Sequence, residues 1–174
     1  MAKLGTTRPL VYLTAGTERV ALEAPWVAAF NALAGLDVDV VATIGPLVDP
    51  ANLGTVPDNV RVERFVPQHF LLSRAVVAAS HGGAGTVLGA AAHGVPQVLY
   101  PVAADQWDNA DAVSRSGSGV VCELGHRDAS ALAAAFQRAL VEPEMRSAAG
   151  LVAAEIAAMP AAADHVAAIE ALVS

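Results

Sequence analysis

The sequence predicts an α/β fold in which a doubly wound parallel sheet of about six strands carries helices on both faces. Short apolar runs alternate with stretches of helical periodicity along the chain, which is the pattern of strands joined by crossover helices. Several runs, such as residues 10–13 and 76–79, are apolar at every position, as expected for strands covered on both faces. No repeat, low-complexity tract or linker divides the 174 residues, a length that suits one domain.

The first half of the chain contains three predicted strands. Residues 10–16 are rich in β-branched and aromatic side chains and end in glycine, which favours a buried strand. Residues 21–36 have apolar positions near helical spacing and predict a helix, and residues 37–45 predict the second strand. Residues 46–59 contain three prolines and predict a loop. Residues 60–66 alternate apolar and charged side chains, which is typical of a strand nearer the sheet edge.

The second half of the chain continues the alternation and ends in helices. A short helix or turn is predicted at residues 67–75. The predicted strands lie at 76–80, 96–101 and 119–124. The predicted helices lie at 84–93, 104–116, 129–140, 143–159 and 161–173, and Pro160 separates the last two.

Composition and charge argue against several classes of function. The chain has 17 acidic and 10 basic residues and a net charge of −7, whereas nucleic acids and anionic membranes require a basic face. Its single cysteine, Cys122, excludes an internal disulfide and is expected to be a buried, apolar residue. No signal-peptide core or apolar run of bilayer length is present. A cytoplasmic protein with no nucleic-acid or membrane partner is therefore expected.

The most informative stretch is SHGGAGT, residues 80–86, which lies between a predicted strand and a predicted helix. Ligands of open parallel sheets bind beyond the carboxyl ends of the strands. Glycines there let a ligand approach the backbone, and the unpaired N–H groups of a helix start attract an anion. An acidic chain can bind phosphate in this way without a formal positive charge. The alternative is a tight turn that only needs glycine, since the stretch matches neither the dinucleotide fingerprint nor the lysine-containing phosphate loop.

Further motifs surround this stretch in a defined order: FVPQ at 65–68, HGGAGT at 81–86, GVP at 94–96, Pro101, and DQWDNA at 105–110. Together they resemble the donor-binding signature of nucleotide-sugar-dependent glycosyltransferases with the two-domain GT-B fold. The likeness is strongest to the bacterial enzymes that decorate antibiotics and other natural products. It covers the chain from about residue 9 onwards and is strongest over 61–112. The resemblance implies a Rossmann-like domain that forms the C-terminal half of a GT-B fold.

The resemblance implies that these motifs bind a nucleotide diphosphate sugar. Phe65 would stack on the nucleobase, the backbone of Val66 would meet the base edge, and Gln68 would shape the turn. Core packing is the alternative for Phe65. His81 would point at the diphosphate, or else would cap and orient the glycine-rich turn at residues 82–86, called the elbow below. The residues that would surround the diphosphate are Gly82, Gly83, Ala84, Gly85 and Thr86 on one side, and Gly16 and Thr17 on the other.

The resemblance also implies a sugar site and a preferred nucleotide. Asp105 and Gln106 would bind sugar hydroxyls through a carboxylate and an amide, although Asp105 is alternatively a charge at a helix start. Trp107 would cover the sugar or contact another domain. Relatives that use UDP-sugars carry a ribose-binding glutamate eight positions after the motif histidine, where this chain has Gly89. The expected co-substrate is therefore a dTDP-sugar rather than a UDP-sugar, with no other cofactor and no metal site.

The resemblance divides the chain into a lead or linker remnant at 1–8, a donor-binding domain at 9–159, and a C-terminal helix at 160–174 that would cross back to an N-terminal domain. In the family that N-terminal domain holds the acceptor and the catalytic base, so no catalytic residue is expected in this chain. The chain is predicted to be the donor half of an inverting glycosyltransferase that acts on a natural product, and to be inactive for transfer alone. The alternatives are a stand-alone nucleotide-sugar-binding partner subunit and half of a UDP-sugar epimerase, against which Gly89 counts.

Overall fold

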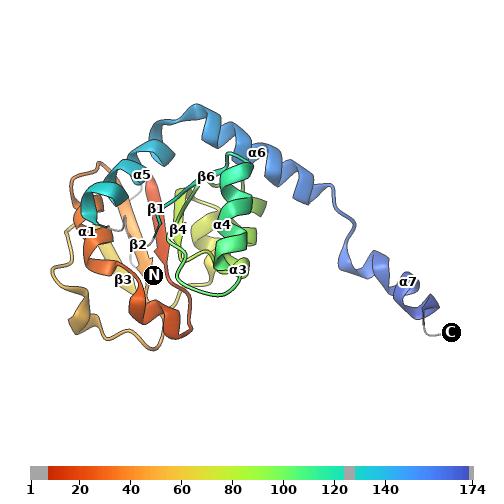
Figure 1. Cartoon of the computed structure of the whole chain (residues 1–174), viewed down its shortest axis with the longest axis horizontal. Helices are drawn as coiled ribbons and strands as arrows, with labels where there is room; N and C mark the ends of the chain where they lie inside the picture. The colour runs from red at the N-terminus through yellow and green to blue at the C-terminus, as the bar shows by residue number, and fades with distance from the viewer. Residues whose placement is uncertain (1–7, 124–127, 173–174) are drawn as a thin grey trace.

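The structure, a computed structural model, describes residues 8–123 and 128–172 and confirms the predicted fold class. Six parallel strands form one sheet in the order β3-β2-β1-β4-β5-β6 (Figure 1). The strand order reverses between β1 and β4, the kind of switch point at which doubly wound sheets bind ligands. The strands are β1 (Leu10–Thr14), β2 (Asp39–Thr43), β3 (Val60–Glu63), β4 (Ala75–Ser80), β5 (Gln97–Leu99) and β6 (Gly119–Val121).

Helices cover both faces of this sheet. The helices are α1 (Trp26–Ala34), α2 (Gln68–Leu72), α3 (Ala84–Ala92), α4 (Gln106–Arg115), α5 (Ala129–Val141), α6 (Pro143–Ala157) and α7 (Val166–Ala171), with 3-10 helices η1 (Arg19–Glu23), η2 (Pro50–Leu53) and η3 (Ala162–His165). One face packs against α1 and α5, whose Phe30 and Phe136 are fully buried in the main core. Smaller clusters that include Tyr12, Leu72 and Val113 join the other face to α2, α3 and α4.

Two elements of the first half differ from their predictions. The helix predicted at 21–36 is interrupted, because Pro25 lies between η1 and α1 and has no N–H to donate to a continuous helix. The loop predicted at 46–59 contains η2. Asp49 caps this short helix by accepting a hydrogen bond from Ala51 N at 3.0 Å. Neither the break at Pro25 nor the short helix capped by Asp49 can be predicted from hydrophobic periodicity alone.

Two later helices also differ. The helix predicted at 104–116 begins at Gln106, because Ala104 adopts a φ of 56°, which is outside the helical region. The described part of the helix predicted at 161–173 is η3 followed by the six-residue α7. The predicted strands form at the expected places. β3 lies at the sheet edge, as the alternating pattern of 60–66 indicated.

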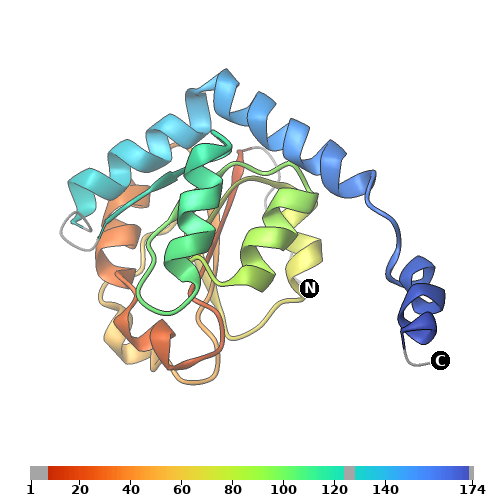
Figure 2. The ribbon, with the colours of Figure 1, turned by 45° about the vertical axis from the view of Figure 1, so that its right-hand side comes forward.

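The C-terminal segment leaves the body of the molecule. α6 follows α5, packs against α3 and then runs outward to α7, which stands clear of the body in both ribbon views (Figure 1 and Figure 2). Ile169 of α7 and the following Leu172 are exposed. Parts of three predicted segments, residues 1–7, 124 and 173–174, lie outside the described residues. Over 8–123 and 128–172, no helix has both the length and the apolar character that crossing a bilayer demands.

Candidate functional site

A small cavity opens at the carboxyl ends of β1, β2 and β3, where parallel sheets bind their ligands. It has a volume of about 100 Å³. Its lining residues are Tyr12, Thr14, Gly16, Thr17, Thr43, Gly45, Arg64, Phe65, Val66, Gln68 and Thr86. The cavity thus brings together predicted site residues from three separate parts of the sequence: the turn after β1, the FVPQ stretch between β3 and α2, and the start of α3.

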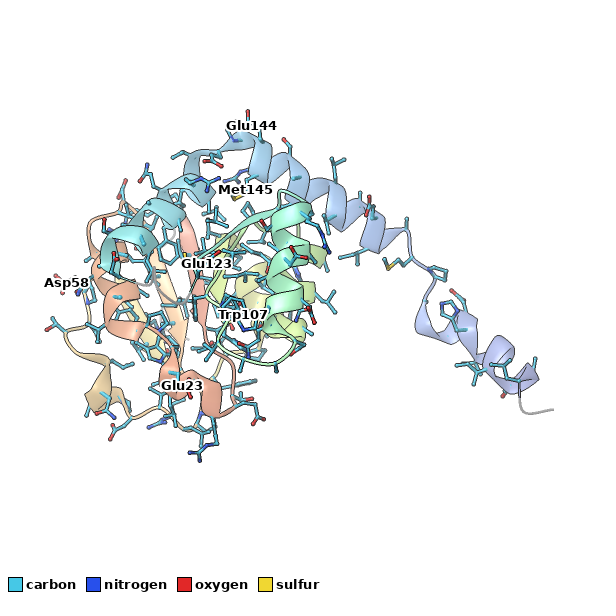
Figure 3. All side chains as sticks on the ribbon, viewed as in Figure 1. Glu23, Asp58, Trp107, Glu123, Glu144 and Met145 are labelled. Atoms are coloured by element: carbon cyan, nitrogen blue, oxygen red, sulfur yellow. The ribbon has the colours of Figure 1, made fainter. Side chains whose placement is uncertain are left out.

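Larger hollows lie elsewhere, but their chemistry fits an anionic ligand less well. A hollow of about 630 Å³ is lined by several glutamates, Glu144 among them, which would repel a phosphate. Figure 3 shows Glu144 and Met145 at the upper end of the body, Trp107 of α4 nearer its middle and Glu23 of η1 at its lower end. A second hollow, of about 360 Å³, is lined mainly by apolar side chains of η1 and α1. Position and polar lining therefore favour the small cavity.

A buried hydrogen-bond network holds the ends of β1 and β2 together beneath this cavity. Tyr12 Oη and Thr43 Oγ1 are 3.0 Å apart, and Thr43 Oγ1 donates to Thr14 Oγ1 at 2.9 Å. Thr14 Oγ1 in turn accepts the Gly16 N–H at 3.2 Å. Tyr100 directly follows β5, and its Oη donates to Thr14 O at 2.5 Å. The network positions the turn after β1, because the Gly16 amide is tied directly to it.

The glycine-rich elbow follows β4 directly and opens α3. Gly82 has a φ of 87°, which a side chain rarely adopts, and its N–H donates to Ser80 Oγ at 3.2 Å. In the described part of the chain no side chain caps the start of α3 at Gly83. Ala84 and Gly85 are exposed in the first turn of that helix. The elbow therefore presents a helix start with its positive dipole end toward solvent, which suits an anion.

His81 lies at the base of this elbow with 8% of its surface exposed. Its ring fits between two glycines: a Cβ added to Gly16 would lie 2.9 Å from His81 Cε1, and one added to Gly83 would lie 2.5 Å from Nε2. Burial lowers the pKa of the imidazole below its ordinary 6.5, and the Asp105 carboxylate opposes this effect. Among the described residues, His81 Nδ1 is buried without a hydrogen-bond partner. Such a group costs folding free energy, which favours a functional role.

The DQWDNA motif joins the start of α4 to the elbow. Asn109 Nδ2 donates to Gly82 O at 2.9 Å and to Asp105 Oδ2 at 3.1 Å. The buried Gln106 accepts the N–H groups of Val102 and Ala103 on its Oε1, at 2.8 and 3.1 Å. The Gln106 oxygen thus orders its own loop, while the exposed Asp105 carboxylate remains open to solvent. The motif places Asp105 beside His81, close enough to affect its pKa.

Comparison with known proteins identifies the family. Residues 27–172 match the family described as "Erythromycin biosynthesis protein CIII-like, C-terminal domain". The chain belongs to this family. It is 39% identical over 171 residues to 4'-demethylrebeccamycin synthase of Lentzea aerocolonigenes, covering 98% of this chain and 40% of that protein. It is 38% identical over 143 residues to tylactone mycaminosyltransferase of Streptomyces fradiae, covering 80% of this chain and 31% of the relative.

Solved structures of natural-product glycosyltransferases share the fold. The glycosyltransferase SnogD of Streptomyces nogalater superposes with a TM-score of 0.83 at 33% identity, over 98% of this chain and 45% of that chain. The glycosyltransferase VinC, solved in complex with DTDP, superposes with a TM-score of 0.78 at 34% identity, over 88% of this chain and 39% of that chain. The chain thus spans less than half the length of these relatives and corresponds to the C-terminal part of their GT-B fold.

In this member of the family, the FVPQ motif lines the cavity next to Thr86 of the elbow. Phe65 is 72% exposed, so the structure leaves its ring open to a ligand rather than packing it in the core. Gln68 Nε2 lies 3.5 Å from Gly85 O, and its Oε1 is 3.4 Å from Thr86 Oγ1. Gln68 therefore connects the start of α2 to the start of α3. Val66 packs against the cluster under α2.

Sequence reasoning missed several residues of this site. Thr14 and Thr43 are the last residues of β1 and β2, and Tyr12 lies in the middle of β1. Their hydroxyls pair across the parallel register of the two strands. Threonine at the end of two buried apolar strands was a usable signal, because a buried hydroxyl needs a partner. Asn109 belonged to a recognised motif but had no assigned role. Arg64 directly precedes FVPQ, and its cationic side chain also lines the cavity.

Proposed function

We propose that this chain is the donor-binding domain of an inverting glycosyltransferase that uses a dTDP-sugar and a natural-product acceptor. The observation that carries the proposal is the single cavity that joins Phe65, Val66 and Gln68 to the turn at Gly16 and to the helix start at Thr86. An exposed aromatic ring suits a pyrimidine, and a helix start suits a diphosphate. In support, VinC was solved in complex with DTDP. Spinosyn rhamnosyltransferase SpnG, 27% identical with a TM-score of 0.84, was solved with thymidine diphosphate.

Each predicted residue has a role in this proposal. Phe65 stacks on the nucleobase, and the Val66 backbone meets its edge. Gln68 shapes the turn and connects it to the start of α3. The residues that surround the diphosphate are Gly16, Thr17, His81, Gly82, Gly83, Ala84, Gly85 and Thr86. The Asp105 carboxylate accepts hydrogen bonds from sugar hydroxyls, and Gln106 contributes through its amide nitrogen, because its oxygen is bonded to the loop backbone.

The domain boundaries belong to the same proposal. Residues 9–159 form the donor-binding domain, preceded by a lead or linker at 1–8. Residues 160–174 form a segment that crosses to the acceptor domain of a whole enzyme. In support of such a docking role, this segment and its approach expose three large apolar side chains, Met159, Val166 and Ile169, which a partner domain could cover.

In the proposed reaction, an acceptor hydroxyl attacks the anomeric carbon while a base takes its proton and the dTDP group departs. The N–H groups of the elbow stabilise the negative charge that develops on the departing diphosphate. Because the acceptor domain supplies the base, the purified 174-residue chain is expected to bind donor but to transfer no sugar to a small-molecule acceptor. Product analysis by mass spectrometry checks this expectation, and robust glycosylation by the chain alone would contradict it.

The proposal predicts which backbone amides respond first to the nucleotide. In an amide chemical-shift titration with dTDP, Gly83, Ala84 and Gly85 are expected to move first, because their N–H groups form the exposed helix start. Surface amides of α6 serve as the internal control and are expected to stay unchanged. If dTDP at millimolar concentration leaves the elbow unchanged while shifting a distant surface, the assignment of the site is wrong.

A further inference from the structure

Arg64 is a cation held in place beside the candidate site. It follows β3, and its Nη1 donates to three carbonyl oxygens of the loop after β2: Gly45 O at 3.4 Å, Pro46 O at 3.2 Å and Val48 O at 3.1 Å. Five N–H donors lie in the fixed plane of a guanidinium. The three carbonyls all engage Nη1, and no described residue accepts a hydrogen bond from Nε or Nη2, so these two nitrogens can bind another partner. The same bonds restrict the orientation of the side chain.

Within residues 8–123 and 128–172, no carboxylate forms an ion pair with Arg64. Every hydrogen bond found for Arg64 in the described part of the chain goes to a backbone carbonyl. Arg61, three residues earlier and within β3, forms an ion pair with Glu63. Arg64 is also the one charged residue among the described residues that line the small cavity. In a chain of net charge −7, this cavity therefore has a locally positive wall.

The position of Arg64 associates it with the glycine end of the cavity. Its Nη1 contacts the Gly45 carbonyl, and Gly45 lies directly against the turn after β1, because a Cβ added to Gly45 would come within 2.6 Å of Gly16 O. Gly16 and Thr17 are the residues proposed to face the diphosphate. The start of α3 offers the diphosphate only a partial positive charge. The Arg64 guanidinium offers it a full positive charge and two further donor nitrogens, Nε and Nη2.

We propose that Arg64 is a donor-binding residue whose guanidinium pairs with the diphosphate of the nucleotide sugar. This inference rests on the proposed function and adds to it a full positive charge that the HGGAGT elbow lacks. The neutral elbow and the cation then hold the diphosphate from two sides. Arg64 contributes chiefly to the affinity for the phosphates and little to the affinity for the nucleoside.

The test compares two ligands that differ only in the diphosphate. The 174-residue chain and its Arg64→Gln variant are titrated with dTDP and with thymidine, by calorimetry or by chemical-shift change. Arg64→Gln is expected to weaken dTDP binding about 10- to 100-fold, the range for loss of a hydrogen bond to a charged group, and to leave thymidine binding unchanged within about twofold. Raising the salt concentration should shrink the difference between parent and variant, because screening weakens the ion pair.

Arg61→Gln is the matched control, since it removes the same charge three residues before Arg64, within β3, at a residue outside the cavity lining. It is expected to leave both affinities unchanged. An equal loss of dTDP and thymidine binding in Arg64→Gln would overturn the inference, because it would show that Arg64 only positions the loop after β2. An unchanged dTDP affinity would overturn it as well. A parent chain that binds no dTDP at all would instead overturn the proposed function, and this inference with it.

Discussion

Gly83→Ala is expected to lower the free energy of unfolding by about 1–3 kcal/mol, the usual cost of overpacking a filled site. The backbone of Gly83 is not the reason, since its φ of −63° is open to any residue. The reason is His81, whose Nε2 would lie 2.5 Å from the added Cβ. The buried imidazole cannot move away freely, because Gly16 lies on its other side. Urea denaturation monitored by circular dichroism measures the change.

Gly85→Ala is the matched control for this prediction. A Cβ added to Gly85, two residues further along the same turn, meets no atom within 4 Å. Its unfolding free energy is expected to stay the same or to rise by up to about 1 kcal/mol, because alanine favours a helix more than glycine does.

His81→Ala gives a second check, since it removes the ring that an alanine at position 83 would strike. In that background Gly83→Ala is expected to cost little, a non-additivity typical of residues in contact. Equal losses from Gly83→Ala with and without His81 would refute the explanation.

The parent chain is expected to bind dTDP about 5- to 150-fold more tightly than UDP, on the basis of an unpaired buried hydroxyl costing about 1–3 kcal/mol. Gly89 offers no side-chain acceptor to a ribose. The 2′-hydroxyl of bound UDP therefore loses hydrogen bonds to water that the protein does not fully replace. A bridging water would place the ratio at the lower end of this range. Calorimetric titration gives both dissociation constants. Adding dUDP, which differs from UDP only in that hydroxyl, separates its effect from that of the thymine methyl group.

Gly89→Glu is expected to narrow or reverse this preference, because a carboxylate can accept hydrogen bonds from both ribose hydroxyls. The structure indicates that the new side chain needs local adjustment: its Cβ would lie 2.6 Å from Gln68 Nε2 and 3.2 Å from Leu72 Cδ1. The Gln68 amide is held only by contacts of 3.4 and 3.5 Å, which are long for hydrogen bonds. It can therefore turn away at little cost.

Gly89→Gln is the control for Gly89→Glu, since it displaces Gln68 in the same way but carries no charge and only one accepting oxygen. Its nucleotide preference is expected to shift less than that of Gly89→Glu. Equal affinities of the parent chain for dTDP, dUDP and UDP would contradict the argument from Gly89, whatever the variants do.

Local sequence patterns predicted the strands and helices correctly wherever the burial of apolar side chains alone decided the conformation. Strands such as β1 and β4 are apolar along their length, and burial on both faces decides their conformation. The prediction failed where a single residue outweighed the periodicity. Pro25 divided a predicted helix, and Ala104 delayed the start of α4 through its positive φ. Both are backbone effects of one residue, which a pattern averaged over several residues does not register.

The sequence by itself determined the parallel α/β class, the place of the elbow between β4 and α3, and the motif order that marks the family. These features depend on neighbouring residues, which the chain holds together covalently. Only the tertiary structure decided that the hydroxyls of Tyr12, Thr14 and Thr43 hold the ends of β1 and β2 together beneath the cavity. It also decided that Arg64 lines the cavity, and that Gly83 must lack a side chain because His81 lies against it. The physical reason is that hydrogen bonds and excluded volume act between atoms close in space, and the register that brings β1 beside β2 appears only once the sheet has formed.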